Sequence, residues 1–356
     1  MDKHQLLTLT DDLTRIVSAS PWNVERFNHI HFVVNVVAGG VSKKKRFLNS
    51  AKVVRDIAGA VAGAADLPPI TRSIHLTDGP GHASQITGII LDEPESDGRL
   101  IISIGGDGTH REVCSAFAER LGDTSGPDRR NIVLFRMPMG TGNDGADAFE
   151  TEAACAILQR GGALRSAGAV RVTATGMHSM YAFNVTSIGI DAYVTDTSNR
   201  MKNAVPGDIY KVIADVATLF YEPVYGVDEV GLTITDDDGG QSEHNDRYIL
   251  VAMGPSGNRC YGNGKRILPT DNNLCAIRTV SLPKKIAMKK HVYEGSHVGL
   301  PGTLSVQARS MVVHYRRRVP LQLDGEGVWL SPENFPVRFE RVDNAIPVLT
   351  TPTGGA

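Results

Sequence analysis

The chain has 356 residues, enough to bury a sizeable core and to form two domains. Its formal net charge of −2 argues against bulk electrostatic binding of nucleic acid. No apolar stretch approaches the roughly 20 residues that span a bilayer, and no secretion signal follows the first residues, so we expect a cytoplasmic protein without a transmembrane segment. The cysteines form no CxxC pair, which argues against a disulfide framework or a thiolate zinc site: they are Cys114, Cys155, Cys260 and Cys275.

The first part of the chain predicts alternating strands and helices. Residues 1–28 predict a short appended helix and a linker. Ile30–Val37 is a continuous apolar run, as expected of a strand buried on both faces. A helical stripe follows, and further strands are expected at Ile70–Leu76, Leu100–Ile104 and Ile132–Phe135. Strand and helix in alternation predict an α/β domain over residues 29–165 with a doubly wound parallel sheet.

The pattern changes at about residue 166. Period-two or β-rich runs now dominate, separated by Gly, Asn and Asp turns, which favours a mainly antiparallel β domain over residues 166–356. One helix is expected, with an apolar face from Ile209 to Phe220. The last strand is compatible with a return to the first domain. The expected strands are Ala169–Thr175, Tyr181–Ile188, Val230–Thr235, Tyr248–Met253, Leu274–Val280 and Arg309–His314.

Two glycine-rich turns each follow a predicted strand of the first domain. They are Gly105–Thr109 and Pro138–Asp144. The carboxyl ends of strands in an open α/β sheet are where ligands bind. Glycine lets the backbone approach a ligand closely, and successive N–H groups at a helix start attract anionic oxygens. Two such turns, each with Gly, Thr and Asp, predict a polyphosphate site.

Asp107 has two interpretations. In a tight turn it caps the next helix. Beside a phosphate site, a carboxylate repels the ligand unless it serves a metal ion or a hydroxyl proton, and phosphoryl transfer requires such a group. The second interpretation is favoured because the residue types and their placement recur in two turns.

These motifs resemble the diacylglycerol kinase catalytic-domain family, which includes bacterial lipid kinases, sphingosine kinases and ceramide kinases. The resemblance runs in order along nearly the whole chain. The matching segments are Asn35–Gly40, Thr77 with Gly81–Ala83, Gly105–Thr109 with Glu112, Pro138–Asp144, Phe183–Asp191, Gln322–Glu326 and the tail Ala345–Leu349.

The resemblance implies ATP and Mg²⁺ as cofactors. It implies Glu326 as the general base and Asp107 as the residue that places the nucleotide Mg²⁺, with Asp107 as the alternative base. Without the resemblance, Asp324–Glu326 is a hairpin turn. The implied ATP-binding residues are Asn35, Gly39, Gly40, Thr77, Gly105, Gly106, Gly108, Thr109, Glu112, Gly140, Thr141 and Asn143.

The chain departs from the family pattern at three places. Val36 and Ala38 replace the usual Pro and Ser of the first loop, and Ala167–Gly168 stand where an Asp is usual. Pro269–Leu274 loosely resembles the segment of a structural Mg²⁺ site, with Asp271 as the candidate ligand.

The sequence thus predicts an ATP-dependent lipid kinase that transfers the γ-phosphate to a hydroxyl of a diacylglycerol-like lipid or a sphingoid base. Basic clusters such as Lys43–Arg46 and Arg316–Arg318 favour peripheral contact with an anionic leaflet, at about 1 kcal/mol per charge near the surface. The alternatives are a soluble kinase similar to NAD kinase and an inactive nucleotide-binding regulatory module. A homodimer is compatible with the sequence.

Overall fold

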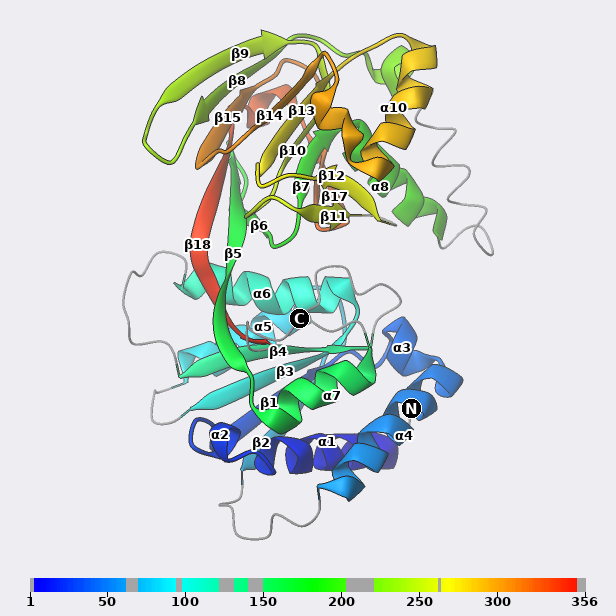
Figure 1. Cartoon of the computed structure of the whole chain (residues 1–356), viewed down its shortest axis with the longest axis vertical. Coiled ribbons are helices and arrows are strands. Elements are labelled where there is room, and N and C mark those ends of the chain that lie inside the picture. Colours follow the sequence, from blue (N-terminus) through cyan, green and yellow to red (C-terminus); the bar gives the residue numbers. More distant parts are fainter. Residues whose placement is uncertain are drawn as a thin grey trace. The chain divides into compact units, whose positions relative to one another are not determined.

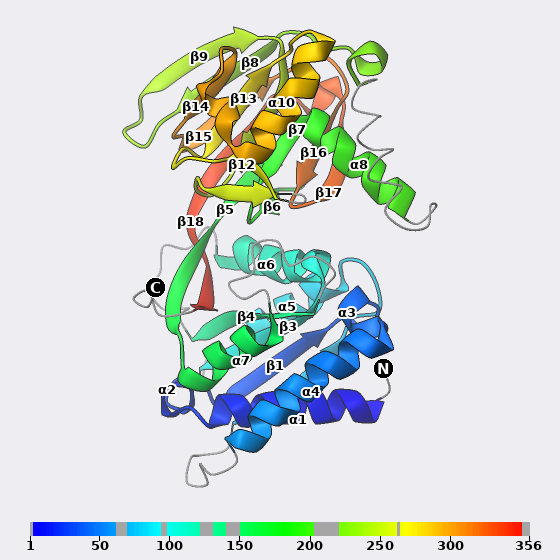
Figure 2. The ribbon, with the colours of Figure 1, turned by 45° about the vertical axis from the view of Figure 1, so that its right-hand side comes forward.

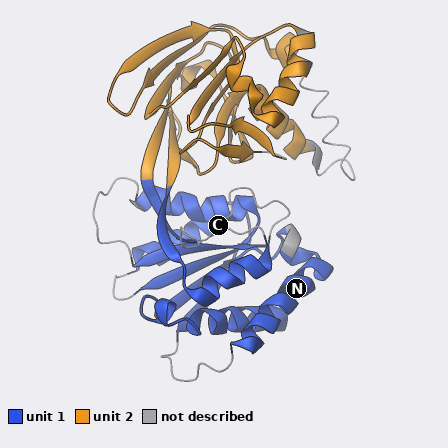
Figure 3. Ribbon diagram, viewed as in Figure 1, with its two compact units in different colours: residues 1–167, 344–356 blue, residues 168–343 orange. Residues whose placement is uncertain are grey.

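The computed structural model describes residues 3–61, 70–93, 98–121, 131–139, 150–202, 221–261 and 264–350. The chain divides into two compact units, coloured separately in Figure 3. Unit 1 comprises residues 1–167 and 344–356, and unit 2 comprises residues 168–343. The division falls close to the expected boundary at residue 165, and the final segment belongs to the first unit.

Unit 1 contains a parallel sheet with the strand order β2-β1-β3-β4-β18. Helices cover both of its faces (Figures 1 and 2), so the doubly wound α/β fold is confirmed. The strands are β1 His29–Val34, β2 Thr71–Leu76, β3 Arg99–Gly105, β4 Ile132–Pro138 and the end of β18, Val337–Thr350. The helices are α1 Lys3–Ser18, α2 Pro21–Val24, α3 Gly39–Ser42, α4 Lys44–Ala60, α5 His82–Asp92, α6 Asp107–Leu121 and α7 Thr151–Arg160.

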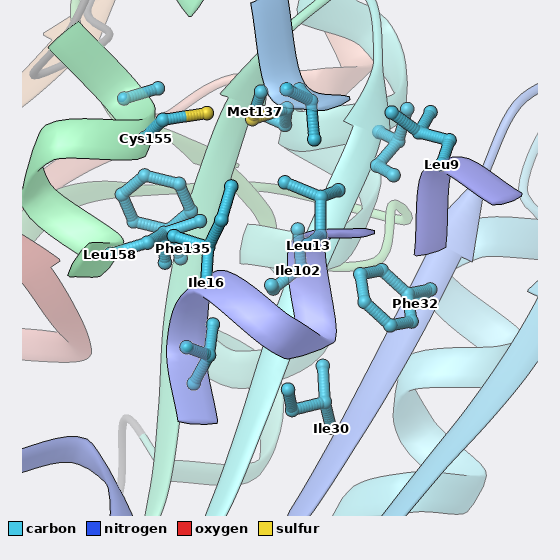
Figure 4. Close-up of a cluster of buried hydrophobic side chains, with 14 of the residues drawn as sticks. Leu9, Leu13, Ile16, Ile30, Phe32, Ile102, Phe135, Met137, Cys155 and Leu158 are labelled. Atoms are coloured by element: carbon cyan, nitrogen blue, oxygen red, sulfur yellow. The ribbon is translucent and has the colours of Figure 1, made fainter. Parts of the chain in front are cut away.

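Helix α1 is part of the core of unit 1, whereas the sequence predicted an appended helix. It contacts α4 and α7, and its apolar residues recur at helical spacing. Leu9, Leu13 and Ile16 lie in one buried cluster with residues of the sheet such as Phe32 and Ile102 (Figure 4). Because burial of each such side chain contributes about 1.5–3 kcal/mol, α1 is an integral layer of the unit.

Unit 2 is a mainly antiparallel β domain, as the sequence predicted, and most of its strands lie in two β sheets. One sheet has the order β14-β13-β10-β7-β16-β17, and the other contains β18, β15, β8 and β9, with β5 paired to β18 and β6. Buried residues of both sheets, among them Leu232, Val251, Met311 and Leu321, form one core. The strands are β5 Ala163–Ala174, β6 Met180–Ala182, β7 Thr186–Gly189, β8 Val230–Thr235, β9 Gln241–Asp246, β10 Tyr248–Met253, β11 Arg259–Tyr261, β12 Lys265–Leu268, β13 Leu274–Arg278, β14 Thr303–Val306, β15 Ser310–His314, β16 Val319–Leu323 and β17 Glu326–Leu330.

The helices of unit 2 are α8 Ile190–Lys202 and α10 Leu282–Glu294, with 3-10 turns at Ser296–Gly299 and Pro332–Asn334. The helix expected over residues 209–220 lies outside the described residues. Among the helices that the structure describes, none is long and apolar enough to cross a bilayer.

The single strand expected at Tyr181–Ile188 is wrong, because the structure splits it into β6 and β7. Between them, the backbone N–H groups of Phe183, Asn184 and Val185 donate to the carboxylate of Asp324. The alternation of apolar and polar residues in the sequence does not show where backbone N–H groups bond to a side-chain carboxylate and not to a neighbouring strand.

Candidate active site

The turn at Gly105–Thr109 connects β3 to α6 in unit 1. A Cβ on Gly105 would lie 2.7 Å from the Cβ of Thr109, so only glycine fits there. At Gly106 the position of a Cβ meets no atom of the described residues within 4 Å. The turn leads into a helix of 15 residues, whose N-terminal N–H groups and dipole favour an anion. A polyphosphate can therefore approach the backbone closely at this turn, next to the N-terminal N–H groups of the helix.

Three adjacent strands present candidate residues at their carboxyl ends. Asn35 follows β1, Thr77 follows β2 and Gly105 ends β3. The amide Nδ2 of Asn35 donates to the Oγ1 of Thr109 at 2.8 Å, which ties the loop after β1 to the turn after β3. The Oδ1 of Asn35 also accepts from the backbone N–H of Val37 at 3.0 Å, and this local turn ends the strand before the apolar run is finished.

Glu112 has a positioning role in the structure. Its two carboxylate oxygens accept from the backbone N–H groups of Gly81 and Ala83, at 2.8 and 3.2 Å. Gly81 has a φ of +81°, a left-handed conformation that favours glycine. The carboxylate on α6 thereby fixes the turn that begins α5, directly after Thr77.

Asp107, the first residue of α6, is paired with Arg136 of β4. The side chain of Arg136 is 8% exposed, whereas that of Asp107 is 38% exposed. The sequence analysis missed Arg136, although an arginine within the apolar run Ile132–Met137 is a signal that could have found it. Charged residues are almost never buried unless they are paired.

A buried histidine lies behind this ion pair. The Nδ1 and Nε2 of His110 are 3.0 Å from the Oγ of Ser103 and 3.4 Å from the Sγ of Cys114. Burial and the nearby Arg136 hold the pKa of His110 well below its ordinary value. The guanidinium, and not the imidazole, therefore carries the positive charge beside Asp107.

Gly39 and Gly40 begin the short helix α3, and Gly108 lies in the first turn of α6. The remaining candidates of the second glycine-rich turn, Gly140, Thr141 and Asn143, lie outside the described residues.

In unit 2, Asp324 and Gly325 form the hairpin turn between β16 and β17. Both have positive φ angles, +49° and +97°. The Asp324 carboxylate accepts from three backbone N–H groups, those of residues 183, 184 and 185, at 2.6, 2.8 and 3.0 Å. Asp324 thus joins two motifs that lie some 140 residues apart in the sequence.

The neighbours of Asp324 have separate roles. Gln322 is fully buried, and its side chain bonds to Val185, Ser187 and Gly325. Glu326 is exposed at the first position of β17. The hairpin interpretation and the functional one are therefore compatible, because the rigid turn presents an exposed carboxylate.

A buried ion pair lies behind this turn. Asp191, 5% exposed, accepts from Ser187 at 3.0 Å and pairs with Lys265 at 3.3 Å. The sequence analysis missed Lys265, which carries no distinguishing pattern. Through Ser187, this pair extends the hydrogen-bond network of Gln322.

Asp271 is exposed and accepts from the Nδ2 of Asn258 at 2.7 Å. Among the described residues, no group of three or more His, Cys, Asp or Glu side chains could hold a metal ion. The structural Mg²⁺ site expected at Asp271 thus lacks a preformed set of such ligands in the part of the chain that is described.

The comparisons with known proteins follow this division into units. Residues 29–172 match the diacylglycerol kinase catalytic domain, and residues 184–350 match the YegS C-terminal NAD kinase beta sandwich-like domain. The first match covers most of the α/β unit with its glycine-rich turn, and the second covers most of the β unit. The chain belongs to the diacylglycerol kinase catalytic-domain family.

The three relatives described next have low sequence identity to this chain. A protein of Bacillus subtilis (strain 168), named "Putative lipid kinase YtlR", is 23% identical over 278 residues, which cover 72% of this chain and 83% of that protein. The crystal structure of "a putative diacylglycerol kinase" from Bacillus anthracis str. Sterne is 20% identical, with a TM-score of 0.59 and coverage of 92% and 96% of the two chains. A second structure from that organism, titled as a diacylglycerol kinase, is 16% identical, with a TM-score of 0.54 and coverage of 92% and 98%. At these identities the structures show the shared fold.

Proposed function

We propose that this protein transfers the γ-phosphate of ATP to a hydroxyl group of a membrane lipid, either diacylglycerol-like or a sphingoid base. The observation that carries the proposal is the turn after β3, where Gly106 opens onto free space at the start of α6 and Asp107 stands beside it. In phosphoryl transfer, positioning and charge stabilisation supply most of the catalysis, and this turn offers both.

The proposal assigns nucleotide binding to unit 1. Mg²⁺, when bound, would neutralise charge on the phosphate groups, and Asp107 is the residue we assign to hold it. Asn35 and Glu112 hold the surrounding loops by the hydrogen bonds described above. The further residues assigned to ATP are Gly39, Gly40, Thr77, Gly105, Gly106, Gly108, Thr109, Gly140, Thr141 and Asn143.

The proposal assigns the general base to Glu326 in unit 2. Its support is the rigid turn, since Asp324 and Gln322 fix the backbone on one side of an exposed carboxylate. A carboxylate near the acceptor hydroxyl takes the proton as the phosphoryl group moves across. Asp107 is the alternative base.

The acceptor class has two supports. The relatives described above are named as lipid or diacylglycerol kinases. Unit 2 also carries side chains typical of a membrane interface. Val224 is 67% exposed, the ring centres of Tyr225 and Trp329 lie 5.3 Å apart with the rings tilted by 41°, and the guanidinium of Arg318 lies 4.6 Å from the Trp329 ring centre. Peripheral contact with an anionic leaflet is part of the proposal.

The test is label transfer from γ-labelled ATP, with Mg²⁺, to a panel of acceptors. The panel contains diacylglycerol, monoacylglycerol, sphingosine and ceramide in anionic vesicles, and NAD in solution. The proposal requires a labelled lipid. Labelled NAD would favour a kinase similar to NAD kinase, and ATP binding without any transfer would favour an inactive regulatory module.

A further inference from the structure

Strand β4 contains an arginine where its neighbours are apolar. Apart from Arg136 and Pro138, the other five residues of β4 are all buried hydrophobics. The arginine side chain itself is only 8% exposed. Removing a guanidinium from water is costly unless a charged partner compensates it. The position of Arg136 is therefore explained by what it pairs with.

The partner is the carboxylate of Asp107 in the glycine-rich turn. In the parallel pairing of β3 and β4, Arg136 lies opposite Ser103, so both side chains leave the sheet on the same face. On that face α6 supplies His110, which bonds to Ser103, and Asp107, which pairs with Arg136. Strands β3 and β4 and helix α6 thus place the guanidinium of Arg136 next to Asp107, the first residue of the helix.

The ion pair between Arg136 and Asp107 reduces an unfavourable electrostatic interaction in the turn. A carboxylate at the start of α6 repels the phosphate groups that the backbone N–H groups attract, and the repulsion is strong where water is partly excluded. A guanidinium that holds the carboxylate ionised, oriented and neutralised removes that repulsion.

We propose that Arg136 is a positioning residue for the nucleotide, which acts through Asp107 by neutralising its charge and fixing its orientation. The inference rests on the proposed nucleotide site. It adds to the site a residue of β4, which lies outside the glycine-rich turns and is not the proposed general base. Arg136 lessens the repulsion between Asp107 and a triphosphate, in addition to the charge that bound Mg²⁺ would neutralise.

The test measures binding of the non-hydrolysable analogue AMP-PNP with Mg²⁺ by calorimetry, with the full chain. Arg136→Met, which keeps length but removes charge, should weaken binding by at least about tenfold, equivalent to about 1.4 kcal/mol. Arg136→Lys should stay within about threefold of wild type, because it restores a cation. In the Asp107→Asn background, Arg136→Met should change the affinity by less than about threefold, because no carboxylate is left for the arginine to neutralise.

A purely structural arginine gives a different result. In that case Arg136→Met weakens binding as much in the Asp107→Asn background as in the wild-type background, and this outcome overturns the inference. Binding by Arg136→Met equal to wild type overturns it as well. If Arg136→Met does not fold, as judged by thermal unfolding, the double variant and Arg136→Lys decide the question by the same thresholds.

Failure of the proposed function is recognised separately. If the wild-type protein does not bind AMP-PNP at all, both the nucleotide site and this inference are overturned. If it binds and only the coupling between Arg136 and Asp107 is missing, the proposed function stands and the inference falls. The double variant provides a last check, since it should bind AMP-PNP as Asp107→Asn does and transfer no phosphate when Asp107 is needed for chemistry.

Discussion

At the scale of single residues, the candidate carboxylates have different duties although each lies in or beside a glycine-containing turn. Glu112 and Asp324 are engaged by backbone N–H groups and hold loops in place. Asp107 is paired with a buried arginine, and Glu326 is exposed. Carboxylates with backbone partners set geometry, and Asp107 and Glu326 are the residues to which the proposed function assigns the chemistry.

Glu326→Gln is expected to lower kcat by about 10²–10⁴-fold, the usual contribution of a general base. The amide keeps the shape of the side chain but cannot take a proton at neutral pH. Because Glu326 lies outside the proposed nucleotide site, the affinity for AMP-PNP should change by less than about threefold. Steady-state kinetics and calorimetry check this, and normal turnover would leave Asp107 as the base.

At the scale of elements, the strand-end turn and helix α1 show how far sequence patterns reach. The apolar runs of β1, β3 and β4 predicted the parallel sheet, and the glycines after β3 predicted the turn. The bond from Asn35 to Thr109 joins residues 74 positions apart and leaves no local pattern. The split between β6 and β7 was missed for the same reason, since a distant partner decides it. Arg136 does stand out in the apolar run of β4, and only its pairing with Asp107 leaves no local pattern.

Gly106→Val tests the turn as a ligand site. No atom lies within 4 Å of the new Cβ, so the midpoint of thermal unfolding should stay within about 2 °C of wild type, while the branched side chain fills the space that phosphate oxygens need. AMP-PNP affinity should fall at least tenfold, about 1.4 kcal/mol. Gly59→Val in α4, also with no atom within 4 Å, is the matched control and should bind normally. Equal affinities would reduce the turn to a connection.

Leu13→Ala tests α1 as part of the core. Leu13 is fully buried, so the truncation should lower the free energy of unfolding by about 2–5 kcal/mol, measured by urea denaturation. Leu7 on the same helix is 38% exposed, and Leu7→Ala should cost less than about 0.5 kcal/mol. A similar small loss for both variants would show that α1 is dispensable.

At the scale of the whole molecule, two chain segments, β5 and β18, cross the division between the units. Each unit has its own buried core. The sequence predicted this organisation from the change of pattern at residue 166. It did not predict that residues 1–28 belong to the core of unit 1, because a single amphipathic helix does not identify the surface that buries it.

The stability of the molecule is expected to fall in mild acid. Burial, with further contributions from His29 and His75, lowers the pKa of His31 from its ordinary value of 6.5 to about 3. Above pH 6.5 the ring is neutral in both states. Below pH 6.5 the ring binds a proton in the unfolded chain, whereas in the folded chain it stays neutral down to about pH 3. Each such histidine therefore lowers the free energy of unfolding by up to about 1.4 kcal/mol for each unit that the pH falls.

Urea denaturation between pH 7.5 and 5 measures this dependence. His31→Gln should have a slope with pH that is shallower by up to about 1.4 kcal/mol per unit below pH 6.5. His244, a β9 residue whose Nε2 lies 3.1 Å from the Oγ of Ser242 on the same strand, is the control, and His244→Gln should change the slope less than His31→Gln does. Identical slopes for all three proteins would contradict the assignment to His31.

The central claim is that the turn at Gly105–Thr109 catalyses phosphoryl transfer to a lipid, and its most direct test compares wild type with Asp107→Asn. The measurement is label transfer from γ-labelled ATP to diacylglycerol or sphingosine in anionic vesicles at saturating ATP. The account predicts a labelled lipid with wild type and, for the nearly isosteric variant, an unchanged unfolding midpoint with less than about a tenth of the activity, a barrier increase above 1.4 kcal/mol. Retention of more than that tenth, or no labelled lipid with the wild-type protein, would contradict it.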